Sequence, residues 1–79
     1  MDTKPTVPCR RITCPKCGHE PAFLSEVWDG GTLDFDYANG MRGEEGIRGE
    51  GAPVKVIAHC DCGHGWTLRG VVQITELDR

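Results

Sequence analysis

Four of the five cysteines in this 79-residue chain stand in two close pairs. Cys14 and Cys17 are separated by two residues, and Cys60 and Cys62 by one. Cysteines at such spacing can turn both sulfurs toward one metal ion, and the glycine that follows each pair tolerates the left-handed backbone that such a turn requires. We therefore expect these four cysteines to bind one Zn²⁺ ion together.

A chain of this length needs the stability that a bound metal ion supplies. A domain of this size buries little apolar surface, so its core alone supplies only about 3 to 5 kcal/mol of stability. Binding of a metal to clustered thiolates adds folding free energy that the core lacks. The first residues, MDTKPTVPCRR, contain no apolar run typical of a signal peptide or a membrane span. We expect a cytoplasmic protein, whose reducing surroundings favour metal–thiolate bonds over disulfides.

The surroundings of the two cysteine pairs are similar to a known kind of domain. Residues 14–19 (CPKCGH) and 60–66 (CDCGHGW) resemble the cysteine knuckles of the zinc ribbon, a family in which two such turns on separate β-hairpins share one tetrahedral zinc. The resemblance implies one small, mostly β, antiparallel domain over residues 1–79 with a single structural zinc. The second turn departs from the family pattern, which has two residues between its cysteines. A site of three cysteines with His64 or His59 therefore stays open as an alternative.

Alternating side chains predict the strands of this sheet. In residues 32–37 three apolar side chains alternate with Asp34 and Asp36, so one face of the strand is apolar and the other is acidic. The sequence Asp-Gly-Gly over 29–31 predicts a hairpin turn before it. Further strands are predicted over 22–28, 54–59 and 65–77, the last with a possible bulge at Gly70. No helix is predicted.

Other segments are expected to be irregular or to contribute single side chains. Residues 1–8 indicate an extended arm, and residues 38–53, with five glycines and one proline, a long loop or an irregular hairpin tip. Cys9 is expected to be a free, at least partly buried thiol and not a fifth ligand. Trp28 and Trp66 are expected to be core aromatic residues that cover the zinc end of the sheet.

The charge is distributed unevenly along the chain. The formal net charge is −3, yet residues 20–50 carry eight acidic side chains against two arginines, while residues 1–19 carry four basic side chains against one acidic one. Phosphate backbones are bound by lysine and arginine. Charge therefore favours a protein partner with a basic surface over nucleic acid. No membrane partner is expected, and a homo-oligomer is compatible with this pattern.

These features together predict a protein that is not an enzyme. Four cysteine ligands leave a zinc ion no open position for water or substrate, and no other catalytic set is recognisable. We expect an adaptor or inhibitor that binds a partner protein. The residues expected to make this contact are Glu26, Asp29, Asp34 and Asp36. Small acidic zinc ribbons resemble accessory proteins of phages and bacteria, which implies inhibition of a host nucleic-acid-binding or defence system, such as an anti-CRISPR or anti-restriction role.

The alternative is a zinc ribbon that binds RNA or DNA and regulates transcription or translation. In that case Arg10, Arg11 and Lys16 would contact phosphates, with Lys55 and Arg69 as further candidates. A tryptophan, Trp28 or Trp66, would then stack on a base.

Overall fold

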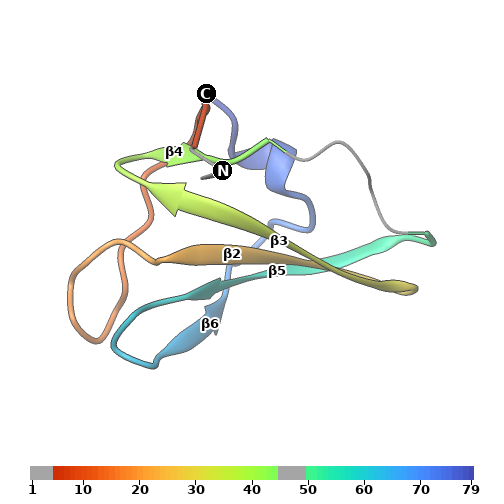
Figure 1. Ribbon diagram of the computed structural model, residues 1–79. Coiled ribbons are helices and arrows are strands. Elements are labelled where there is room, and N and C mark those ends of the chain that lie inside the picture. The colour runs from red at the N-terminus through yellow and green to blue at the C-terminus, as the bar shows by residue number, and fades with distance from the viewer. Residues whose placement is uncertain (1–4, 45–49) are drawn as a thin grey trace.

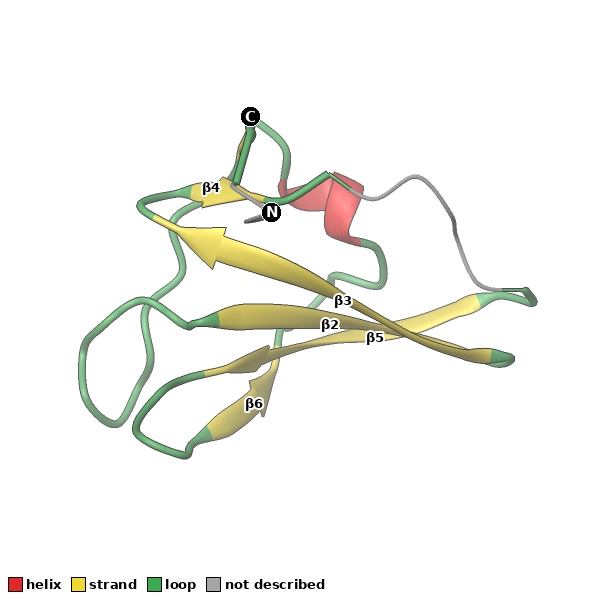
Figure 2. Ribbon diagram, in the orientation of Figure 1, coloured by secondary structure: helices red, strands yellow, loops and turns green. Residues whose placement is uncertain are grey.

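The computed structural model describes residues 5–44 and 50–79 of the chain. The described residues form one antiparallel sheet in the strand order β1-β4-β3-β2-β5-β6, followed by one short 3₁₀ helix, η1 (Figures 1 and 2). The strands are β1 (Val7–Pro8), β2 (Phe23–Trp28), β3 (Gly31–Ala38), β4 (Met41–Arg42), β5 (Pro53–His59) and β6 (Gly65–Thr67), and η1 is Ile74–Leu77. The predicted class, a small and mostly β antiparallel domain, is confirmed.

The centre of the sheet is the long strand β2, which pairs with β3 on one side and β5 on the other. Leu24 lies opposite Phe35 and Ala58. Because paired residues of neighbouring strands point to the same side of a sheet, these apolar side chains share one face. The turn at 29–30 joins β2 to β3, as the Asp-Gly-Gly motif predicts.

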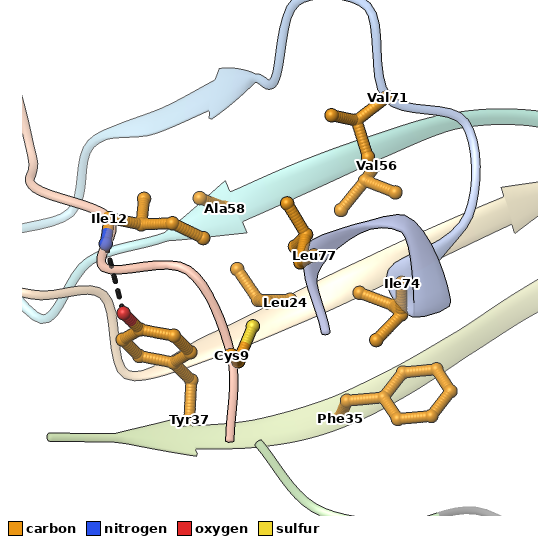
Figure 3. Close-up of a cluster of buried hydrophobic side chains, with 10 residues drawn as sticks. All are labelled: Cys9, Ile12, Leu24, Phe35, Tyr37, Val56, Ala58, Val71, Ile74 and Leu77. Atoms are coloured by element: carbon orange, nitrogen blue, oxygen red, sulfur yellow. Dashed lines mark hydrogen bonds between the residues drawn. The ribbon is translucent and has the colours of Figure 1, made fainter. Parts of the chain in front are cut away.

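The core fills one side of this sheet. Segments 9–12 and 71–77, from the two ends of the chain, lie across the apolar face and close it (Figure 3). The buried side chains are Cys9, Ile12, Leu24, Phe35, Tyr37, Val56, Ala58, Val71, Ile74 and Leu77. Cys9 is completely buried and free of any disulfide, and burial raises the pKa of its thiol.

The prediction of one strand over 65–77 is wrong beyond its first residues. β6 ends at Thr67, the chain turns at Gly70 with a φ of +70°, and η1 begins at Ile74. Ile74 and Leu77 then point into the core, as a 3₁₀ helix with three residues per turn allows, and Val71 is buried just before the helix. Burial of this segment across the sheet, and not the alternation that suggested a strand, decides its conformation.

The irregular loop expected over 38–53 contains regular structure at its start. β3 continues to Ala38 and turns through Asn39 and Gly40 into β4. Both turn residues have positive φ, 53° and 74°, as a two-residue hairpin loop of the mirror-image type requires. Residues 45–49 of the expected loop lie outside the described residues.

The extended arm expected over 1–8 also joins the sheet. Val7 and Pro8 form β1, which pairs with Arg42 and Met41 of β4. Residues 1–4 lie outside the described residues. No helix in the described part of the chain has the length and the apolar character needed to cross a membrane.

Candidate metal centre

Two turns at one end of the sheet bring four cysteines together. The ligand atoms of Cys14, Cys17, Cys60 and Cys62 all lie within 4.8 Å of one another. The sulfurs of Cys14 and Cys62 are 3.8 Å apart, and those of Cys17 and Cys60 are 3.3 Å apart. Four sulfurs at about 2.3 Å from a tetrahedral zinc lie about 3.8 Å from each other. The cluster therefore has the dimensions of a site for one metal ion.

The first turn precedes β2 and is closed by its own backbone. The amide of Cys14 donates to the carbonyl of His19 at 2.8 Å, and the amide of Gly18 donates to the carbonyl of Cys14 at 2.9 Å. Gly18 has a φ of +80°, a conformation that side chains other than glycine rarely adopt. The amide of Lys16 lies 3.4 Å from the sulfur of Cys14 and donates to it, which stabilises a thiolate there.

The second turn joins β5 to β6 and reaches the same closure with one residue fewer. The amide of Cys60 donates to the carbonyl of His64, and the amide of Gly63 donates to the carbonyl of Cys60, both at 2.9 Å. Gly63 has a φ of +95°. The shorter spacing between Cys60 and Cys62 is thus accommodated by a tighter turn, which still points both sulfurs at the first pair.

The four sulfurs influence the ionisation of one another. Burial opposes ionisation of Cys14, but the backbone amides of Cys17 and Lys16 and the neighbouring thiols outweigh it and lower the pKa of Cys14 to about 7. At Cys60 the amide of Cys62 favours the thiolate, but the hydrogen bond with Cys17 and burial outweigh it and raise the pKa to about 12. Without a cation the cluster therefore retains protons, and a metal ion has to displace them on binding.

The donor set fits zinc. Thiolate ligands favour zinc, copper(I) and iron–sulfur chemistry over hard cations such as Mg²⁺, and four of them around one ion form a closed tetrahedral site. Cys14 and Cys60 are buried, whereas Cys17 and Cys62 lie at the surface. One metal ion would join the turn before β2 to the turn between β5 and β6.

Neither histidine considered as an alternative ligand lies in this cluster, among the residues that the structure describes. The ring of His59 stacks on Phe23, with 4.5 Å between ring centroids and an interplanar angle of 11°. The ring of His64 stacks on Trp66, at 5.6 Å and 12°. The structure thus brings together the four cysteines and engages both imidazoles elsewhere.

The two tryptophans lie at different ends of the sheet. Trp66 packs against the core next to the second cysteine turn, as expected. Trp28 pairs with Gly31 at the far hairpin, about 17 Å along β2 from Phe23 and the cysteine end. The expectation that Trp28 covers the zinc end is therefore wrong. Its indole Nε1 instead donates a hydrogen bond of 2.9 Å to Glu26.

Glu26 does not belong to an exposed acidic surface. It is completely buried, and it lies opposite Leu33 and Val56 on the face that carries the core. The remaining acidic residues predicted for partner binding, Asp29, Asp34 and Asp36, are all exposed. The prediction for Glu26 is wrong because its strand has apolar residues on both faces, so the sequence pattern does not reveal which face is buried.

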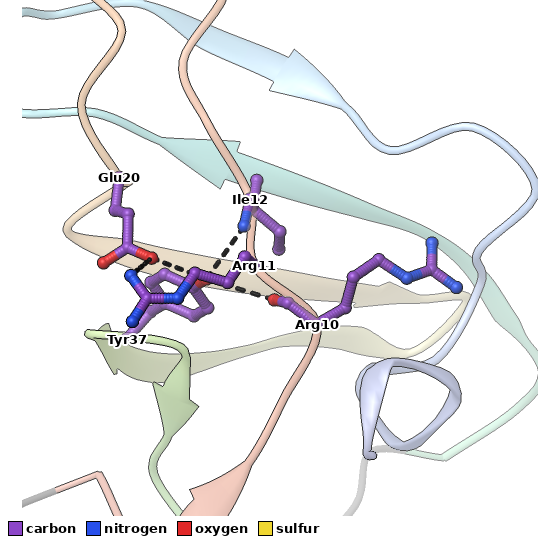
Figure 4. A network of polar contacts seen from close by, with 5 residues as sticks. All are labelled: Arg10, Arg11, Ile12, Glu20 and Tyr37. Atoms are coloured by element: carbon purple, nitrogen blue, oxygen red, sulfur yellow. Dashed lines mark hydrogen bonds and ion pairs between the residues drawn. The ribbon is translucent and has the colours of Figure 1, made fainter.

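The basic residues predicted to contact nucleic acid have different surroundings. Arg11 forms an ion pair of 3.0 Å with Glu20, next to the hydroxyl of Tyr37 (Figure 4). Arg10 and Lys16 are exposed. Part of the basic character of this segment is therefore neutralised within the chain.

Comparison of the chain with protein-family models, with curated proteins and with solved structures finds no match. What the structure establishes is a small β domain whose four clustered cysteines are positioned to bind one metal ion.

Proposed function

We propose that this chain is a zinc-stabilised protein-binding domain that acts without catalysis, as an adaptor or inhibitor toward a partner with a basic surface. The observation that carries the proposal is the closed cluster of four cysteines at one end of the sheet. Four cysteine ligands fill a tetrahedral sphere and leave no position for water or substrate. The metal ion would then stabilise the fold, and the function would depend on residues at the surface.

The exposed carboxylates supply the second element of the proposal. Asp34 and Asp36 project from β3 on the face opposite the core, and Asp29 lies at the adjacent hairpin. Complementary charge steers association and selects among partners. An acidic surface of this kind is suited to cover a basic site on a protein that otherwise binds nucleic acid. Inhibition of a host nucleic-acid-binding or defence protein, encoded by a phage, is the form of this function that we propose.

The experiment is a pull-down from bacterial lysate with the tagged, zinc-loaded protein, with and without nuclease. A partner protein should be retained after nuclease treatment, and the double variant D34N/D36N should release it. The matched control E44Q/E50Q removes two other exposed carboxylates and should retain the partner. Recovery that disappears with nuclease and with R10A/R11A would contradict the proposal and favour binding of nucleic acid.

A further inference from the structure

The face of the sheet opposite the core is open. Segments 9–12 and 71–77 cover only the apolar face, on the side of β1, β4 and η1 (Figures 1 and 3). On the opposite side, which we call the outer face, the described side chains are exposed or half-buried, apart from the small Ser25. No described segment crosses this face.

The register of the strands shows how the outer face is composed. Phe23 of β2 lies opposite Asp36 of β3 and His59 of β5. One step along, Ser25 lies opposite Asp34 and Ile57. The outer face therefore has an acidic row on β3 and an apolar centre over β2 and β5. The apolar centre consists of Phe23, Val27, Ile57 and the ring of His59, and the exposed Lys55 lies on the same face of β5, opposite Val27.

Contacts within the outer face hold both parts in place. The rings of Phe23 and His59 stack in nearly parallel planes, 4.5 Å apart, so each ring covers one face of the other and holds it in place beside the cysteine turns. The hydroxyl of Ser25 donates a hydrogen bond of 2.7 Å to Asp34, which fixes the direction of that carboxylate. The carboxylates of Asp34 and Asp36 are attached two residues apart on one strand, about 7 Å along it.

We infer that the outer face docks a segment of a partner protein that presents lysine or arginine next to aliphatic or aromatic side chains. This inference rests on the proposed protein-binding function and specifies the surface that performs it. The basic side chains of the partner pair with Asp34 and Asp36, while its apolar side chains cover Phe23 and Ile57. A partner with basic groups alone would leave the apolar centre uncovered. An apolar partner without basic groups would leave Asp34 and Asp36 unpaired.

Two other occupants fit the outer face less well. A nucleic acid would bring phosphates toward the two carboxylates of β3, which repel them. A second copy of this chain, docked face to face, would bring the acidic rows into the same interface, where like charges are costly. Charge complementarity therefore selects a basic and apolar protein segment.

The test is selection of binders to the zinc-loaded protein from a random-peptide library, followed by affinity measurements on four proteins. Selected peptides should combine lysine or arginine with aliphatic or aromatic residues. Their affinity should fall about tenfold or more both with I57T and with D34N/D36N. It should be unchanged with the charge-matched control E44Q/E50Q, which removes two other exposed carboxylates. Zinc content and amide NMR dispersion establish that each variant is folded.

The possible outcomes separate the inference from the proposed function. Peptides that depend on Asp34 and Asp36 but not on Ile57 would overturn the inference and leave acidic-surface binding intact. If no peptides are selected, or if the selected peptides bind I57T and D34N/D36N as well as the wild type, both the inference and the proposed function are contradicted. A dimer in analytical ultracentrifugation that I57T dissociates would show that a second copy occupies the outer face, and would overturn the inference.

Discussion

The buried carboxylate of Glu26 accepts a hydrogen bond of 2.7 Å from the backbone amide of Ile74, 48 residues further along the chain. This bond ties the central strand β2 to the start of η1, and the indole of Trp28 donates a second bond to the same carboxylate at 2.9 Å. A carboxyl side chain in the interior thus positions the helix that closes the core.

Replacing this carboxylate by an amide should destabilise the fold. In E26Q only one side-chain oxygen remains as an acceptor, so the amide of Ile74 or the indole of Trp28 faces an NH₂ group instead. A buried donor without an acceptor costs about 1 to 3 kcal/mol. The free energy of unfolding, from urea titration followed by tryptophan fluorescence, should decrease by that amount. The exposed control D36N should stay within about 0.5 kcal/mol of the wild type. An equally stable E26Q would show that Glu26 does not anchor η1.

Two ion pairs of the chain should differ in their contribution to stability. The nearly buried Arg42 donates to both carboxylate oxygens of Asp78, at 2.7 and 2.8 Å, whereas the exposed Arg11 makes a single contact with Glu20. D78N leaves the guanidinium of Arg42 without its counter-charge and should cost about 2 kcal/mol, between the values for exposed and for buried pairs. R11Q should cost less than about 1 kcal/mol. Thermal unfolding of both variants gives the comparison, and equal losses would contradict it.

Tyr37 is the only tyrosine of the chain, so its ionisation can be followed directly by ultraviolet absorbance. Burial raises the pKa of its hydroxyl above 10.0, although the amide of Ile12 donates to its oxygen at 2.9 Å and partly opposes the shift. The folded state therefore holds the neutral phenol while the unfolded chain ionises near pH 10. Stability from this group is complete below pH 10 and is lost as the pH rises from there through the folded-state pKa.

The spectrophotometric titration of the folded protein should have its midpoint above pH 10. A midpoint at or below 10 in protein that circular dichroism shows to be folded would contradict this environment of Tyr37. Y37F abolishes the signal and serves as the control. It also leaves the amide of Ile12 without its acceptor, which should cost about 1 to 3 kcal/mol.

The glycines of the two cysteine turns should be needed for metal affinity. A methyl group added at Gly18 or Gly63 meets no atom within 4 Å, so G18A and G63A act only through the backbone, where φ is +80° and +95°. A left-handed backbone costs a residue with a side chain about 1 to 2 kcal/mol, which corresponds to roughly a tenfold loss of affinity. Competition with a chromophoric chelator measures this loss.

Gly65 provides the matched control for the two turn glycines. An alanine there would meet the carbonyl of Ala58 at 3.6 Å, an ordinary contact, and the backbone is not left-handed. G65A should keep the metal affinity of the wild type. If G18A and G63A also keep it, the turns do not depend on the backbone that the structure shows.

The sequence predicts the strands best where one face is clearly apolar. In β3 three apolar side chains alternate with Asp34 and Asp36, and the structure buries Phe35 and Tyr37 while leaving both aspartates exposed. In β2 both faces carry apolar residues, and the buried face is decided by the segments that pack on it from the two ends of the chain. The sequence of β2 alone therefore does not predict that Glu26 is buried.

The Asn39-Gly40 hairpin, η1 and the cysteine cluster differ in how well the sequence predicts them. The Asn39-Gly40 hairpin carries a strong local turn signal, but it lies in a glycine-rich stretch that suggests an irregular loop. The four residues of η1 carry a weaker local signal, the capping box in which Glu76 accepts from the amide of Gln73 at 2.9 Å. The bond to Glu26 and the core packing of η1 depend on contacts distant in sequence. The cysteine cluster is the opposite case, since the spacing within each pair and the glycine after it predict a metal site, while the choice of four cysteines over His59 or His64 needs the structure.

The most direct test is the metal content of the protein, purified without added metal and measured by native mass spectrometry. One zinc ion per chain is expected in the wild type and in C9S, whose buried thiol lies outside the cluster. C60S should lose both the metal and the dispersed amide spectrum of a folded protein, because the remaining core supplies only about 3 to 5 kcal/mol. A wild-type protein that is folded and free of metal would contradict the metal centre described here.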